Sequence, residues 1–325
     1  MAAKRVLIID EDIEVRRSLR AGLMQFGWQV EEATDGLTSI EQIRRANAEG
    51  AGFCCLITEA FLTDVDGKLL LKAYRAEYPQ LPLVVLTSFG DEARRRQVEN
   101  LQPAAYLEKP LAMETLLAEL GKFSFKTTTE HAEPAPETAP RQPEAYMFLR
   151  LLDNERAGEI LMELRAMDGV RIGNAVRGEY DIVLRLAVDS GDKLAAAVEK
   201  VKQTAGVTVL ATERLEKPRL TPEVEDFIKH YESVSAEDRA AYRTGVETNA
   251  YLMIDIDRYQ LERIYTSIIM TEGVIGCQAS SGGAKLTVLM SGAVRPNVLR
   301  HVLQKLATMD GIRRVREATV INIAR

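Results

Sequence analysis

The sequence predicts an α/β domain with a doubly wound parallel sheet of five strands, followed by two smaller α+β domains. Two observations support this prediction. Short apolar runs alternate with helical patterns from residue 5 to residue 120, which is the order of a parallel sheet covered by helices on both faces. After residue 145, one pattern of strands and helices occurs twice, which is typical of two related units.

The elements of the first domain, residues 1–123, follow one another with short connections. Ile13, Val15, Leu19 and Leu23 fall at helical spacing, and Gly27 ends that helix. Strands are predicted at 5–9, from 28, at 53–57, at 83–86 and near 106, and helices at 13–25, 37–48, 68–77, 91–99 and 111–120.

Polar side chains end four of these predicted strands. Asp10 and Glu11 follow the first strand, Glu59 the third, Thr87 the fourth and Lys109 the fifth. The carboxyl ends of parallel strands meet at one edge of a sheet, where ligands gather. We therefore expect these side chains to form one site.

This constellation resembles the receiver domain of two-component response regulators, over about residues 4–122. In that family an acid pair ends strand one, a phosphoacceptor aspartate ends strand three, a Thr or Ser ends strand four and a Lys-Pro ends strand five. The phosphoacceptor lies eight residues before a loop glycine, which is Gly67 here. The family's acids, phosphoacceptor, hydroxyl, switch aromatic and lysine match Asp10, Glu11, Glu59, Thr87, Tyr106 and Lys109.

The departure from the family is that Glu replaces Asp at positions 11 and 59. Mg²⁺ requires oxygen ligands at about 2.0–2.1 Å in octahedral geometry, and an error of about 1 Å in placement can cost about 100-fold in rate. Asp10 and Glu11 are thus candidate ligands of a weakened Mg²⁺ site. Three interpretations of Glu59 remain open: an inert scaffold, a permanent mimic of the phosphorylated state directed at Lys109 and Thr87, and genuine phosphorylation.

Two segments separate the predicted domains. Residues 124–144 are rich in Pro, Thr and Glu and are predicted to be a disordered linker. Residues 217–248 are predicted to be a helical connector, with Thr221 as the N-cap and Pro222 in the first turn. A DNA-reading helix pair is the alternative, but the many acids of this segment favour a spacer.

The repeat relates Ala145–Leu151 to Ala250–Ile256, with a period of about 104–105 residues. Each copy has the order strand, helix, strand, strand, helix, strand, which is the ferredoxin-like unit. The predicted domains are 145–216 and 249–325.

The first copy resembles the effector-binding domain of Lrp/AsnC-type regulators, a relative in shape of the ACT domain. Met167–Val170 and Gly178–Asp181 carry the resemblance, which implies that Gly178, Tyr180 and Asp181 lie near an effector pocket. A hairpin turn with a capping aspartate is the alternative. The second copy has Gly282–Lys285 at this place and lacks both the Tyr and the Asp.

The composition narrows the possible functions. A net charge of −6 gives no bulk support for nucleic-acid binding, and the start of the chain leads directly into a strand, so no leader is expected. No apolar run is long enough to span a membrane. Cys54, Cys55 and Cys277 are expected to be buried thiols in a reducing cytoplasm.

These observations predict a cytoplasmic signalling regulator and not an enzyme, because no nucleophile–base set or metal cluster is evident outside the receiver-like site. The expected partners are proteins, such as a histidine kinase or a downstream regulator, together with a second copy of the chain and a small-molecule effector. No cofactor is expected apart from the weakened Mg²⁺, and nucleic acid is an unlikely partner. The alternative function is a DNA-binding transcriptional regulator of the response-regulator class.

Overall fold

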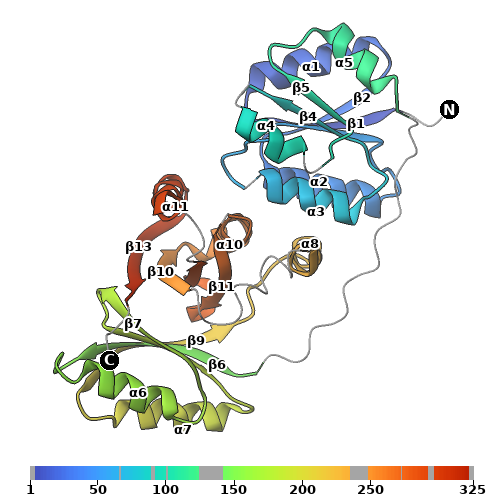
Figure 1. Ribbon diagram of the computed structural model, residues 1–325. Coiled ribbons are helices and arrows are strands. Elements are labelled where there is room, and N and C mark those ends of the chain that lie inside the picture. The colour runs from blue at the N-terminus through green and yellow to red at the C-terminus, as the bar shows by residue number, and fades with distance from the viewer. Residues whose placement is uncertain are drawn as a thin grey trace. The chain divides into compact units, whose positions relative to one another are not determined.

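A computed structural model describes residues 4–65, 67–88, 92–99, 102–123, 142–234, 248–271, 273–291 and 296–321. The chain divides into two compact units (Figure 1). The first contains the N-terminal α/β part together with helix α8, and the second contains the strands from β6 onward. The predicted linker at 124–144 lies outside the described residues up to position 141.

The first unit has a five-stranded parallel sheet in the order β2-β1-β3-β4-β5. Helices α1 and α5 cover one face of the sheet, and α2 and α3 cover the other (Figure 1). The predicted doubly wound parallel sheet is therefore confirmed. Its elements are β1 (Arg5–Ile9), α1 (Ile13–Gln25), β2 (Gln29–Ala33), α2 (Gly36–Ala48), β3 (Cys55–Thr58), α3 (Gly67–Glu77), β4 (Leu83–Thr87), α4 (Glu92–Glu99), β5 (Ala105–Glu108) and α5 (Met113–Leu120).

Local sequence explains where two of these helices begin. The Asp12 side chain accepts hydrogen bonds from the backbone N–H groups of Glu14 and Val15, and Asp35 accepts one from Thr38. These side chains satisfy donors that a helix start leaves without an intrahelical partner. The third strand extends one residue beyond the predicted range because Thr58 pairs with Ile9 of β1, so Glu59 follows the strand directly.

The second unit is a closed barrel of eight strands in the order β10-β12-β11-β9-β6-β8-β7-β13. Each copy of the repeat supplies four strands. The first copy contains β6 (Glu144–Leu151), α6 (Ala157–Ala166), β7 (Val170–Gly178), β8 (Ile182–Ala187), α7 (Gly191–Lys202) and β9 (Val207–Glu216). The second contains β10 (Thr248–Ile256), η1 (Arg258–Gln260), α10 (Leu261–Ile269), β11 (Val274–Ser280), η2 (Ser281–Gly283), β12 (Lys285–Ser291), α11 (Pro296–Thr308) and β13 (Ile312–Val320).

The two copies join at two antiparallel seams. At one seam β9 pairs with β11, and at the other β7 pairs with β13. Successive side chains of β6 point to opposite faces of the sheet. Met147 and Leu149 pack with residues of α6 and α7. Tyr146 and Phe148, on the other face, pack with residues of the second copy, including Tyr251. The apolar face turned away from the helices is therefore buried between the copies of a single chain.

Helix α8 (Pro222–Val234) follows β9 in the sequence but packs on α2 and α3 of the first unit. The predicted helix in the connector is therefore present. The second short helix that the sequence predicts, from residue 235, lies outside the described residues.

Two further expectations concern the environment of the chain. All three cysteine side chains are buried, as predicted. Within the described residues, no helix is both long and apolar enough to cross a membrane.

Candidate functional site

Three of the predicted site residues meet at the carboxyl edge of the parallel sheet. Lys109, which follows β5, donates a hydrogen bond from Nζ to Glu59 Oε2 at 2.8 Å and another to Asp10 Oδ2. The three side chains are no more than 12% exposed. The strand ends therefore bring the three residues together at one edge, as predicted, and place one ammonium group between two carboxylates.

The second oxygen of Glu59 also has partners. Oε1 accepts hydrogen bonds from the backbone N–H groups of Ala60 at 2.8 Å and Phe61 at 3.4 Å. Asp10 is held in a similar way, because its Oδ1 accepts a hydrogen bond from the backbone N–H of Asp12 at 2.9 Å. Both carboxylates are therefore fixed from two sides, by Lys109 and by backbone donors.

The surroundings of Lys109 act on its pKa in opposite directions. Burial disfavours the charged ammonium, but the hydrogen bonds to Asp10 and Glu59 and their negative charges outweigh that effect. The pKa of Lys109 is consequently raised above its usual value. The lysine is a permanent cation at neutral pH.

Glu11 does not join this ion cluster. Its Oε1 accepts a hydrogen bond from the backbone N–H of Thr63, in the loop between β3 and α3. In the same loop, Asp64 accepts hydrogen bonds from the backbone N–H groups of Gly36 and Leu37, at 3.1 and 2.9 Å. The longer side chain of Glu11 thus holds a loop, and Asp64 links that loop to the start of α2.

The residues do not present a Mg²⁺ site in this arrangement. Lys109 lies between Asp10 and Glu59, where its ammonium is paired with one oxygen of each carboxylate, and Glu11 is turned to Thr63. Among the residues that the structure describes, no group of three His, Cys, Asp or Glu side chains could hold a metal ion. The predicted ligand pair of Asp10 and Glu11 is therefore not assembled.

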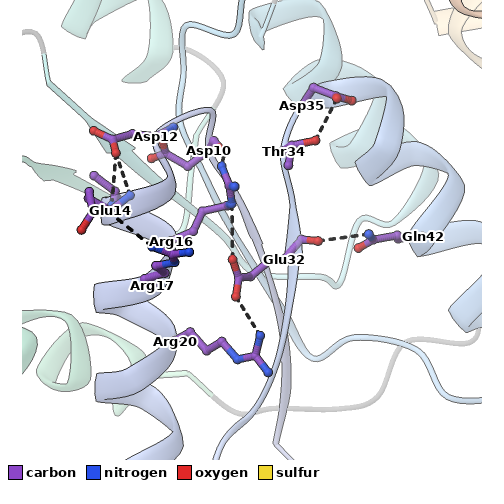
Figure 2. A network of polar contacts seen from close by, with 11 residues as sticks. Asp10, Asp12, Glu14, Arg16, Arg17, Arg20, Glu32, Thr34, Asp35 and Gln42 are labelled. Carbon is purple, nitrogen blue, oxygen red and sulfur yellow. Dashed lines mark hydrogen bonds and ion pairs between the residues drawn. The ribbon is translucent and has the colours of Figure 1, made fainter.

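A buried arginine supports the site from behind and was not predicted. Arg16 of α1 donates a hydrogen bond from Nη1 to the backbone carbonyl of Asp10 at 2.6 Å and one from Nε to Glu32 at 3.3 Å (Figure 2). Arg20 donates to the other oxygen of Glu32. The sequence contained a pattern that predicts this burial, because Arg16 lies three residues before Leu19, on the apolar face of the helix.

The hydroxyl and the aromatic residue of the predicted site differ in exposure. Thr87, at the end of β4, is completely buried. Tyr106 of β5 is partly exposed, and the guanidinium of Arg95 lies 5.4 Å from the centre of its ring. Tyr106 is therefore not fully buried, and it contacts a side chain of α4.

Comparisons with known proteins find similarity in the N-terminal part of the chain. Residues 6–121 match the response regulator receiver domain family. The chain is 33% identical to the response regulator MprA of Mycobacterium ulcerans over 137 residues, which is 42% of this chain and 56% of that protein. It is 32% identical to MprA of Mycobacterium leprae over 130 residues, 39% of this chain and 54% of that protein. Residues 6–121 thus form a receiver domain, and the match spans about half the length of these relatives.

Solved structures also resemble this part of the chain. The chemotaxis response regulator CheY4 of Vibrio cholerae is 26% identical, with a TM-score of 0.33, over 37% of this chain and 98% of that chain. A response regulator from Burkholderia pseudomallei, solved with a phosphorylated aspartic acid, a calcium ion and citrate, is also 26% identical. Its TM-score is 0.32, over 36% of this chain and 66% of that chain.

The predicted effector residues of the second unit all make structural contacts. Gly178 lies at the β7–β13 seam, opposite Ala318. Tyr180 packs on Phe148, with the ring centres 4.8 Å apart, and it accepts a hydrogen bond from Arg316 at 3.1 Å. Asp181 accepts a hydrogen bond from the backbone N–H of Leu151 at 2.8 Å. The effector role of these three residues stays a prediction.

A pocket of about 410 Å³ lies elsewhere on the second unit. Residues of α7 and β9 line it together with Ser281, and its polar lining includes Lys202, Thr212 and Arg214. Gly178, Tyr180 and Asp181 are not among the lining residues.

Proposed function

We propose that the chain is a two-component-type signalling regulator whose receiver domain acts without phosphorylation. The contact between Glu59 and Lys109 carries this proposal, because it gives the lysine that follows β5 a permanent anionic partner. An aspartate carries the same charge on a side chain one methylene shorter, and in a phosphorylated receiver the phosphoryl group supplies both added reach and a charge of about −1.5 to −2. Glu59 thus fixes the domain in one state.

The chemistry of the site supports this assignment. Attack on a phosphoryl donor requires a free carboxylate oxygen and a cation that bridges it to the donor. Here Lys109 and backbone N–H groups occupy both oxygens of Glu59, and Glu11 is turned away towards Thr63. The buried ion cluster is therefore a structural element, and no catalytic activity is proposed for the chain.

The output of the regulator is proposed to pass through its C-terminal unit. The strand orders β9-β6-β8-β7 and β13-β10-β12-β11, each with two helices, support our proposal that the two copies are paired ferredoxin-like domains. On the resemblance to Lrp/AsnC effector domains, we assign this unit to protein contact or to sensing of a small molecule in the cytoplasm. Proposed protein partners are a histidine kinase, a downstream regulator and a second copy of the chain.

Exposure to a phosphoryl donor tests the proposal. The full chain would be incubated with Mg²⁺ and acetyl phosphate, or with a beryllium fluoride complex, and followed by intact mass and by fluorescence of Trp28, the single tryptophan. We expect no change in the native chain. The matched variant carries Glu59→Asp with Glu11→Asp, which restores the family's acids, and it is expected to respond. A saturable, Mg²⁺-dependent modification of Glu59 in the native chain would overturn the proposal.

DNA binding is the competing function, and charge argues against it. The chain has a net charge of −6, whereas DNA binding depends strongly on cationic contacts with phosphate. A duplex-binding assay at low and moderate salt separates the two functions. We expect no salt-sensitive binding at micromolar chain concentration.

A further inference from the structure

The α2–α3 face of the receiver domain carries an amphipathic helix that lies far away in the sequence. Val224, Phe227, Ile228 and Tyr231 of α8 follow helical spacing, and each is no more than 5% exposed. The opposite side of α8 carries Asp226, whose side chain is 58% exposed. One face of α8 is therefore buried in the same compact unit as α2 and α3.

Phe227 is the central contact of this interface. Its ring lies 6.2 Å from the ring of Tyr74 in α3 and 5.7 Å from the guanidinium of Arg44 in α2. The Tyr74 hydroxyl is in turn hydrogen-bonded to Ser39 of α2 at 2.6 Å. Phe227 therefore contacts both receiver helices at the point where they are joined to each other.

A buried ion pair lies beside Phe227. Arg44 of α2 donates to Glu77 of α3 at 2.6 Å, and the two side chains are only 12% and 5% exposed. The hydroxyl of Tyr78 also donates to Glu77, at 3.0 Å. Desolvating an ion pair is costly unless its geometry and surroundings are fixed. The stability of this pair therefore depends both on the distance between α2 and α3 and on the packing of α8 beside it.

The same two helices border the loop that follows Glu59. Asp64 of that loop accepts hydrogen bonds from Gly36 and Leu37 at the start of α2. The packing there is tight, because a Cβ added at Gly36 would lie 2.3 Å from a methyl group of Val65. A displacement of the loop must therefore move α2 or break the contacts of Asp64.

We propose that the α2–α3 face is the output surface of this receiver domain and that α8 is the segment of the same chain that binds to it. The chain enters α8 from β9 and continues to β10, both strands of the barrel, so the docked helix is the route by which the receiver acts on the C-terminal unit. The position of the Asp64 loop sets the spacing of α2 and α3 and thereby the docking of α8. This inference does not depend on the charge of Glu59.

Hydrogen exchange on the full chain tests the docking. Phe227→Ala should speed exchange of the protected amides of α2, α3 and α8 by about tenfold or more, because it removes the central contact. Amides of β6 and β10 should be unchanged, which shows that the barrel remains folded. Asp226→Ala places the same new residue on the exposed face of α8 and should leave all of these rates alone. Phe227→Leu should retain most of the protection.

The coupling to the loop has its own test. Asp64→Ala should speed exchange in α8 as well as at the start of α2, where Gly36 and Leu37 donate hydrogen bonds to Asp64. Unchanged exchange in α2 and α3 after Phe227→Ala would refute the docking. Faster exchange at the start of α2 without any change in α8 after Asp64→Ala would refute the coupling.

Discussion

Lys109 Nζ lies 2.8 Å from Glu59 Oε2, although 50 residues separate the two positions in the sequence. The contact explains how two acids, Asp10 and Glu59, are buried side by side without strong repulsion. The ammonium lies between them and is hydrogen-bonded to both.

The first prediction is that Glu59→Gln destabilises the receiver domain by about 1–3 kcal/mol. The substitution keeps the length of the side chain but removes a charge-assisted hydrogen bond in a largely buried site. The midpoint of chemical denaturation, read from Trp28 fluorescence, measures the effect. Glu108→Gln is the matched control, because Glu108 is about half exposed and its ion pair with Arg95 spans 3.8 Å. Equal midpoints for the two variants would contradict the prediction.

The second prediction concerns alkaline pH. The folded-state pKa of Lys109 is raised above 10.5, its ordinary value, so the unfolded chain loses this proton first as pH rises. The stabilisation by Lys109 should be complete below about pH 10.5 and should be lost as pH passes through the higher folded-state pKa. Denaturation of the native chain and of Lys109→Met, followed by Trp28 fluorescence, should show a constant difference at neutral pH that shrinks in strong alkali. A difference that does not vary with pH would contradict this.

The third prediction is that a side chain at position 178 strains the seam between β7 and β13. Gly178 has φ of +152°, and a Cβ at this position would lie 2.4 Å from the carbonyl oxygen of Glu317 in the paired strand. Gly178→Ala should therefore destabilise the second unit by roughly 1–3 kcal/mol. Gly191→Ala is the control, because nothing lies within 4 Å of its added Cβ. Thermal unfolding by circular dichroism compares the two, and a harmless Gly178→Ala would show that the seam is adjustable.

The fourth prediction uses a buried phenol of the barrel. Burial raises the pKa of Tyr251 from 10.0 to about 12, and a hydrogen bond from Asn174 only partly opposes this shift. The unfolded chain therefore loses this proton first, and the stability of the second unit should fall between about pH 10 and pH 12. Tyr251→Phe should make that decline shallower in urea denaturation followed by circular dichroism. Ultraviolet absorbance should show one phenol fewer titrating late, and an identical decline in both proteins would be the contrary result.

The position of the receiver site could be predicted from the sequence because a parallel sheet leaves little choice. The carboxyl ends of its strands lie at one edge, so Asp10, Glu59 and Lys109 were expected at that same edge. The spacing of residues along the sequence predicts where the backbone lies, but it does not predict the direction in which a flexible side chain points. For that reason Glu11, which was expected beside Asp10 as a metal ligand, was found to hold Thr63 instead.

The contacts between distant segments could not be predicted in the same way. The apolar spacing of Val224, Phe227 and Tyr231 predicts a helix with one buried face, but it does not identify the surface that buries that face. The strand β7 presents a similar problem, since an edge strand has the same pattern whichever strand it pairs with. Only the three-dimensional structure shows α8 on the receiver domain and β7 on β13.

The closure of the barrel within one chain has a consequence for stoichiometry. A barrel assembled from two separate chains dissociates on dilution. In this chain the two halves are covalently connected, so each half is always present at a high effective concentration for the other, set by the connecting segment. The seams are therefore independent of protein concentration. The two halves also need not have the same sequence. Tyr180 lies in the first copy, whereas the second copy has no tyrosine at the corresponding place.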